Sequence, residues 1–143
     1  MSTSTASTAV PAGLNAFKPR ITHVAYHVAD IDRALAFYVG VLGLKELMRI
    51  PLPGGEHEVV LGFPDGKGGG LILMWNAQRS AQYALGDGYS RFIINVSDVD
   101  GAVAQLAEQG VRVTSQPADA GPMRYAMIAD PDGYTIELLQ IKR

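Results

Sequence analysis

The sequence predicts an α+β fold built from two βαβββ modules. Its 143 residues, 48% of them hydrophobic, suffice for one domain with one core. An internal repeat divides the chain, because the pattern at residues 28–36 returns 68 positions later. Short strand-like runs then follow each predicted helix. One such module would bury too little apolar surface alone, so we expect the two to pack together, within the chain or across a dimer.

The first half begins with a strand and a capped helix. Residues 21–28, ITHVAYHV, mix β-branched and aromatic residues with polar ones, as strands do. Asp30 or Asp32 can cap the helix that follows, and Gly43 ends it. Turn-forming segments then separate three further strands, expected at 45–50, 57–63 and 71–75.

The second half repeats this order of elements. A strand is expected at 92–96, Asp98 or Asp100 can cap the next helix, and Gly110 ends it. The three remaining strands are expected at 111–115, 123–129 and 135–141, separated by QPADAGP and DPDG.

Composition excludes several classes of function. The net charge is −2 without any basic block, which argues against a nucleic-acid surface or a polybasic membrane anchor. The chain has no cysteine, so any metal must be held by His, Asp or Glu. Residues 1–20 lack a signal-peptide pattern and predict a flexible arm before a single domain at 21–143. We expect a cytoplasmic protein whose partners are a small molecule and a second copy of itself.

Three stretches resemble one known family. THVAYHVADIDRALAFYVGVLGLK, LGDGYSRFIINVSDVDGAVAQL and DPDGYTIEL resemble the opening, the second module and the closing hairpin of the vicinal-oxygen-chelate (VOC) superfamily. This superfamily includes glyoxalase I, bleomycin-resistance proteins and extradiol dioxygenases. The resemblance covers modules at about 21–76 and 89–141, and it is strongest to short bacterial glyoxalase I (lactoylglutathione lyase). It implies that the two βαβββ modules form paired, cup-shaped mixed sheets and that the protein is a homodimer.

The resemblance also implies a metal site with four ligand positions, on the first and fourth strands of each module. Glyoxalase I fills them with two His and two Glu. Here His23 and Glu137 match, whereas Arg91 and Leu73 stand where His and Glu are expected. Arg offers only hydrogen-bond donors and Leu offers no ligand atom. We therefore predict no metal cofactor, and if a divalent Ni, Zn, Mn or Fe ion binds, His23 and Glu137 would hold it.

A proton-transfer role is predicted for three of these residues. Glu137 would abstract a proton next to a carbonyl, while Arg91 and His23 would stabilise the oxyanion that develops. A purely structural ion pair between Glu137 and Arg91 is the alternative. His27, which lies on the same strand face as His23, could contact substrate, and either His27 or Glu58 could complete a metal site.

Strand alternation predicts a mostly apolar substrate-binding face. Such a face suits a hydrophobic or aromatic compound that carries a carbonyl. Glyoxalase I has an Arg at the position of His27 that helps to hold the glutathione carboxylate, so the substitution argues against glutathione. The residues expected on this face are His27, Leu73, Trp75, Ile93, Asn95, Thr135 and Leu139.

Three functions remain open from the sequence. The first is a metal-independent, glyoxalase-like lyase or isomerase acting on a small carbonyl compound. The second is a metal-dependent glyoxalase-like enzyme. The third is a non-catalytic protein that binds a small molecule such as an antibiotic, as bleomycin-resistance proteins do. Retention of His23 and Glu137 favours the first function over the third.

Overall fold

A computed structural model of the chain describes residues 13–143, so most of the predicted arm, residues 1–12, lies outside the described part. The first module contains four strands and one interrupted helix. These elements are β1 (His23–His27), α2 (Ile31–Leu35), its π-helical continuation η2 (Ala36–Val41), β2 (Lys45–Pro51), β3 (Glu56–Gly62) and β4 (Gly70–Asn76). Short 3-10 turns, η1 (Asn15–Phe17) and η3 (Pro53–Gly55), precede β1 and β3.

The second module repeats this plan with a longer helix. Its elements are β5 (Phe92–Asn95), α3 (Val99–Glu108), β6 (Arg112–Ala120), β7 (Met123–Ala129) and β8 (Thr135–Ile141). Strand β6 continues through the segment QPADA, which we expected to be a loop. Register shifts between Val113 and Ser115 and between Ser115 and Ala118 let the strand accommodate Pro117, as β-bulges do.

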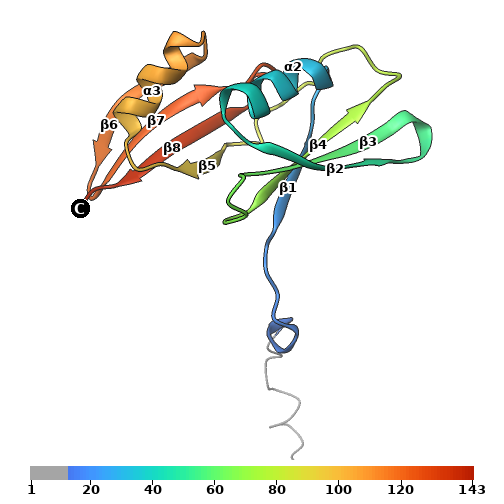
Figure 1. Cartoon of the computed structure of the whole chain (residues 1–143), viewed down its shortest axis with the longest axis horizontal. Coiled ribbons are helices and arrows are strands. Elements are labelled where there is room, and N and C mark those ends of the chain that lie inside the picture. The colour runs from blue at the N-terminus through green and yellow to red at the C-terminus, as the bar shows by residue number, and fades with distance from the viewer. Residues whose placement is uncertain (1–12) are drawn as a thin grey trace, which may run out of the picture.

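The two sheets confirm the predicted fold. Sheet one has the strand order β1-β4-β3-β2 and sheet two the order β5-β8-β7-β6. In each, the first strand pairs in parallel with the fourth and the remaining pairs are antiparallel. Figure 1 shows the two sheets side by side, each with its helix on one face.

The helix starts agree with the repeat. Asp30 accepts a hydrogen bond from Arg33 N, and Asp98 accepts one from Gly101 N, both at 3.0 Å. Asp30 and Asp98, rather than Asp32 and Asp100, are therefore the N-caps. Among residues 13–143, no helix is long and apolar enough to cross a membrane.

Each sheet has a covered face and an open face. The covered faces pack against α2, η2 and α3 and form the core, which includes Tyr26, Val28, Leu73, Ile136 and Leu138. The open faces carry the alternate residues, and on β1 these are His23, Ala25 and His27, all exposed. Because no helix within residues 13–143 packs on the open faces, these faces are available to a ligand or a second chain.

The DPDG turn of module two fastens the two modules together. Asp130 is 5% exposed and accepts hydrogen bonds from the Tyr38 hydroxyl at 2.6 Å and from the Tyr134 backbone N–H at 2.8 Å. Burial raises the pKa of the Asp130 carboxyl. Two residues later, Asp132 accepts a hydrogen bond from Ala29 N at 3.0 Å. These buried contacts fix how the two sheets sit relative to each other.

Candidate functional site

An ion pair occupies the open face of sheet two. Arg91 Nε donates a 2.6 Å hydrogen bond to Glu137 Oε1, and Arg91 Nη1 donates to Ser90 Oγ at 2.9 Å. The Glu137 side chain is only 8% exposed, whereas that of Arg91 is 40% exposed. Among residues 13–143, Arg91 is the only hydrogen-bond donor to the Glu137 carboxylate. One carboxylate oxygen is thus available to a ligand beside a cation.

His23 lies at the start of β1 on sheet one. Its Nδ1 is 2.9 Å from Thr22 Oγ1, and the residue pairs with Gly70 on β4. A Cβ atom built on Gly70 would lie 2.9 Å from His23 Cδ2 and 2.6 Å from the backbone oxygen of Leu61. The absence of a side chain at Gly70 therefore leaves the space that the imidazole occupies.

We expect Gly70→Ala to destabilise the fold and displace His23. The new methyl group would meet backbone as well as the imidazole, so we expect a loss of about 1–3 kcal/mol in the free energy of unfolding. Gly88→Ala is the matched control, because no atom lies within 4 Å of its added Cβ. Urea unfolding of both variants measures the difference. Equal stabilities would contradict the tight contact around Gly70.

His27 belongs to a second polar group at the far end of β1. Its Nδ1 lies 3.8 Å from Glu56 Oε1, and Asn76 Nδ2 donates a 2.8 Å hydrogen bond to Glu56 Oε2. The imidazole stacks on Tyr83 with a centroid distance of 4.8 Å, and the Arg79 guanidinium lies 3.9 Å from the centroid of the Tyr83 ring. The sequence gives no signal for these partners, because Glu56 lies on β3, Asn76 ends β4, and Arg79 and Tyr83 lie in the irregular segment that follows.

The predictions that Leu73 and Trp75 line the open face are wrong. Leu73 pairs with Tyr26 on β1, is fully buried and belongs to the core. Trp75 packs against the same core and lies 5.0 Å, between ring centroids, from His57. Every residue of the run LILMW is apolar, so alternation in the sequence could not reveal which set faces the core.

Ile72, one residue earlier, takes the position that we assigned to Leu73. In sheet one Ala25 pairs with Ile72, and in sheet two Ile93 pairs with Glu137. Since Ala25 and Ile93 are 68 residues apart in the repeat, Ile72 is the counterpart of Glu137. The four repeat-related positions of the open faces are therefore His23, Ile72, Arg91 and Glu137.

The other predicted ligand contacts lie on sheet two. Ile93 and Asn95 are exposed on β5 and pair with Glu137 and Leu139 on β8. Thr135 precedes Glu137 by two residues on the same face, and its carbonyl accepts a 2.6 Å hydrogen bond from the Tyr89 hydroxyl. Ile93, Asn95, Thr135 and Leu139 thus share a face with the Arg91–Glu137 pair, as predicted from strand alternation.

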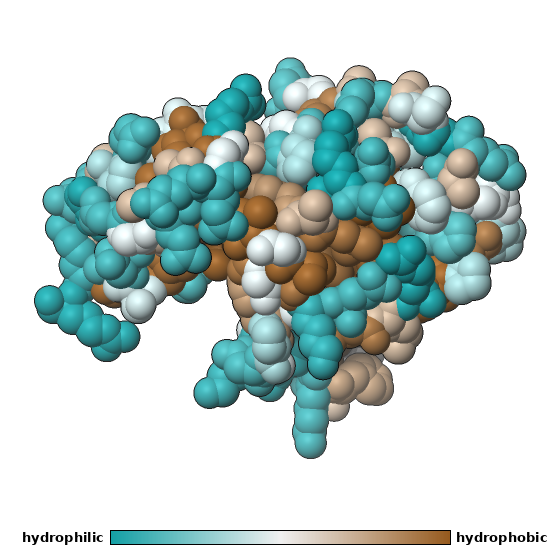
Figure 2. All heavy atoms as spheres, turned by 45° about the horizontal axis from the view of Figure 1, so that its top comes forward, coloured by the Kyte–Doolittle hydropathy of each residue, from teal (hydrophilic) through white to brown (hydrophobic). Residues whose placement is uncertain are grey.

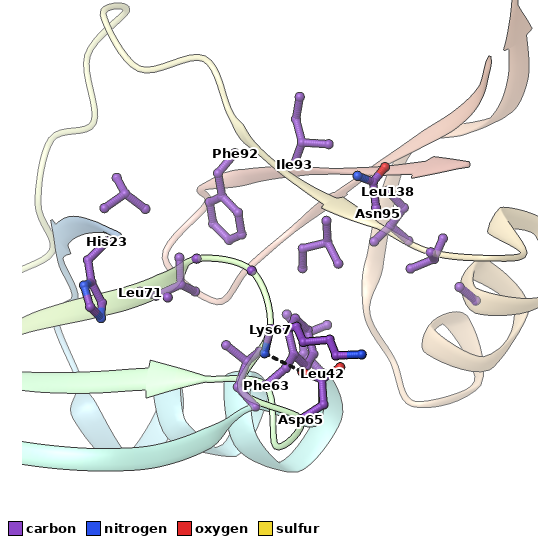
Figure 3. Close-up of a pocket in the computed structure, with 18 of the residues that line it drawn as sticks. His23, Leu42, Phe63, Asp65, Lys67, Leu71, Phe92, Ile93, Asn95 and Leu138 are labelled. Carbon is purple, nitrogen blue, oxygen red and sulfur yellow. Dashed lines mark hydrogen bonds between the residues drawn. The ribbon is translucent and has the colours of Figure 1, made fainter. Parts of the chain in front are cut away.

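A groove of about 830 Å³ separates the two modules. His23 lines it from sheet one and Ile93 and Asn95 line it from β5, but Arg91 and Glu137 do not. Figure 3 shows His23 on one wall and the β5 residues on the other, with Phe63 and Leu42 below. Hydrophobic residues are visible in the hollow between the two halves (Figure 2). Within one chain, His23 and the ion pair therefore belong to separate parts of the molecule.

The side chains at the four repeat-related positions do not fit a metal ion. Only His23 and Glu137 offer a lone pair, Ile72 offers none, and the Arg91 cation already binds the Glu137 carboxylate. Within residues 13–143, no three His, Asp or Glu side chains gather closely enough to hold a metal ion.

Known proteins are similar to this chain in fold and in sequence. A lactoylglutathione lyase of Arabidopsis thaliana is 36% identical over 128 residues, which cover 85% of this chain and 44% of that protein. The chain thus spans less than half the length of this plant relative. A trypanothione-dependent glyoxalase I of Leishmania major is 32% identical, with a TM-score of 0.75 and coverage of 86% of this chain and 87% of that one.

An antibiotic-binding protein, TnmS3 of Streptomyces sp. CB03234, is also similar, at 27% identity and a TM-score of 0.68 over 87% of this chain and 97% of that one. The same architecture therefore serves both lyases and binding proteins among the relatives. The model of one family matches residues 20–138, which include all eight strands except the last three residues of β8. The chain belongs to the glyoxalase/bleomycin resistance protein/dioxygenase superfamily.

Proposed function

We propose that the protein is a metal-independent lyase or isomerase that moves a proton next to the carbonyl group of a small molecule. The Arg91–Glu137 pair on the open face of sheet two carries this proposal. A carboxylate with one oxygen free of protein donors can accept a proton from carbon. A guanidinium beside it can stabilise the negative charge that then develops on the carbonyl oxygen.

The proposed reaction consists of proton transfers and needs no oxidant or reductant. Glu137 takes a proton from the carbon next to the carbonyl, and the C–H electron pair forms the double bond of an enolate. An N–H of Arg91 donates to the enolate oxygen. For a 2-hydroxy carbonyl compound, Glu137 then returns the proton to the former carbonyl carbon while the proton of the 2-hydroxyl group moves to the oxygen on that carbon, which completes an isomerisation. For a substrate that carries a leaving group on the next carbon, the enolate re-forms its carbonyl and expels that group with its bonding electron pair. Glu137 then gives its proton to the leaving group, which completes a lyase reaction.

We further propose that the working unit is a homodimer. The open face of sheet one from one copy would cover the open face of sheet two from the other, because neither is covered within its own chain. This arrangement would bring His23 of one copy toward the ion pair of the other. Ala25, Ile72 and Met74 on sheet one and Ile93 and Leu139 on sheet two would then surround an apolar substrate.

Proton exchange with solvent tests the function directly. The protein would be treated with EDTA and incubated in D₂O with aromatic and aliphatic 2-hydroxy and 2-oxo aldehydes, with and without glutathione. We expect proton NMR to detect deuterium at the carbon next to the carbonyl, at a rate that EDTA does not change. Exchange that requires added nickel, zinc, manganese or iron would instead assign a metal-dependent enzyme.

Ligand sequestration is the second candidate function. It is favoured by the likeness to TnmS3 and by the fact that Arg91 already neutralises the Glu137 carboxylate. Tight binding of an aromatic compound in calorimetry, without deuterium exchange for any carbonyl compound in the panel, would assign this function and overturn the enzymatic one.

A further inference from the structure

Tyr125 lies on the open face of sheet two, close to the ion pair. On β7, Ala126 and Ile128 are buried in the core, whereas Tyr125 is half-buried and lies on the opposite face of the strand. It pairs with Leu139 on β8, two residues after Glu137. Tyr125 and Glu137 are therefore diagonal neighbours, for which the Cα atoms lie about 7–8 Å apart, and an aromatic side chain can span this separation.

The Tyr125 hydroxyl is open to a ligand. The hydroxyls of Tyr38, Tyr89 and Tyr134 donate hydrogen bonds to other protein groups and so hold the fold together. Within residues 13–143, the Tyr125 hydroxyl has no such partner, and it is not among the polar atoms that are buried without one. Its removal would therefore cost the fold little stability.

Along the strands, Glu137 lies between Arg91 and Tyr125. Ile93 pairs with Glu137 in parallel strands, so Arg91, two residues earlier, approaches from the side where β8 begins. Tyr125, opposite Leu139, approaches from the side where β8 ends. A small molecule bound over the Glu137 carboxylate can thus contact both the guanidinium and the phenol.

The isomerisation proposed above needs a group that moves a proton between two oxygens. Glu137 serves the carbon atoms in that reaction, and the Arg91 guanidinium donates hydrogen bonds but keeps its protons. The proton of the 2-hydroxyl group must nevertheless reach the former carbonyl oxygen. A phenol is both donor and acceptor, and it releases a proton more readily than the hydroxyl of Ser or Thr.

We propose that Tyr125 is a further catalytic residue, which transfers the proton between the two oxygens of a 2-hydroxy carbonyl substrate. This inference rests on the proposed function. After Glu137 has taken the carbon-bound proton, Tyr125 gives its hydroxyl proton to the former carbonyl oxygen and takes the proton of the 2-hydroxyl group. The negative charge thereby moves to the second oxygen.

The return of the proton to carbon then restores both residues. Glu137 gives its proton to the former carbonyl carbon, which binds it with the electron pair of the C=C double bond. An electron pair on the second oxygen forms the new carbonyl. Tyr125 is again a neutral phenol and Glu137 again a carboxylate, so the cycle consumes no other reactant.

Replacement of Tyr125 by Phe separates the two proton transfers, because it removes the hydroxyl and keeps the ring. The probe is 2-hydroxy-2-phenylacetaldehyde, an aromatic 2-hydroxy aldehyde whose isomer is 2-hydroxyacetophenone. In D₂O, proton NMR measures both deuterium exchange at the carbon that bears the hydroxyl group and formation of the isomer. Because Glu137 is unchanged, we expect exchange within about threefold of the original rate and isomerisation at least about tenfold slower.

Tyr26→Phe is the matched control. The Tyr26 hydroxyl is buried in the core without a hydrogen-bond partner, so we expect both rates to stay within about threefold of the original. Isomerisation by Tyr125→Phe as fast as by Tyr26→Phe would overturn the role of Tyr125 and leave the proposed function standing. An equal loss of exchange and isomerisation in Tyr125→Phe would also overturn this role. If the original protein neither exchanges nor isomerises any 2-hydroxy aldehyde, the proposed function fails and this inference fails with it.

Discussion

Replacement of Glu137 by Gln is expected to slow proton exchange by about 10²- to 10⁴-fold, the usual contribution of a positioned general base. Gln keeps an oxygen that can accept the hydrogen bond from Arg91 Nε, so the fold and the position of Arg91 should persist. The rate of deuterium incorporation measured by NMR, with substrate affinity measured by calorimetry, separates loss of the base from loss of binding.

Glu58→Gln is the matched control for this experiment. Glu58 is a half-buried carboxylate on β3, paired with Met74 on the open face of sheet one. The control removes one negative charge from the other open face and leaves Glu137 in place, so we expect exchange within about threefold of the original rate. A Glu137→Gln variant that retained full exchange would rule out Glu137 as the base.

Introduction of the two missing ligands is expected to create a metal site. Ile72→Glu together with Arg91→His would place four His and Glu side chains at the repeat-related positions of the open faces. We expect the double variant to bind close to one divalent ion per chain, at least about a hundredfold more tightly than the original protein. Competition with a chromogenic chelator and plasma mass spectrometry measure the affinity and the metal content.

A control shifted by one residue makes this experiment specific. Leu73→Glu with Arg91→His introduces the same two side chains, but residue 73 is fully buried on the covered face. We expect this variant to bind no additional metal and to lose several kcal/mol of stability, because it buries an unpaired carboxylate. Failure of Ile72→Glu with Arg91→His to gain any metal would show that the open faces do not combine into one cup.

Much of the fold was predictable because the chain repeats itself. The offset of 68 residues relates Asp30 to Asp98 as helix caps and His23 to Arg91 on the open faces. The resemblance supplied Arg91 and Glu137, and counting alternate residues from them along β5 and β8 placed Ile93, Asn95, Thr135 and Leu139 on the same face. This prediction needed only the period of a strand, because Arg91 and Glu137 had already fixed which face it is.

Other features depend on contacts that a sequence does not display. The apolar run of β4 gave no sign that Ile72, rather than Leu73, faces outward. The stacking of Tyr83 on His27 joins β1 to an irregular segment, and such contacts follow no periodicity. The extension of β6 past Pro117 depends on bulges that the pairing with β7 tolerates. Tertiary packing decides each of these cases.

The two Pro-Asp-Gly turns, at 64–66 and 131–133, occupy similar places in the two modules but make different contacts. Asp132 of the second turn binds module one, whereas Asp65 of the first accepts a hydrogen bond from the N–H of Lys67 in its own loop. The second turn joins the two halves, whereas the first is followed by a run of glycines and lines the groove. Two halves with the same order of elements thus form an asymmetric molecule, with a closed joint at one turn and an open recess at the other.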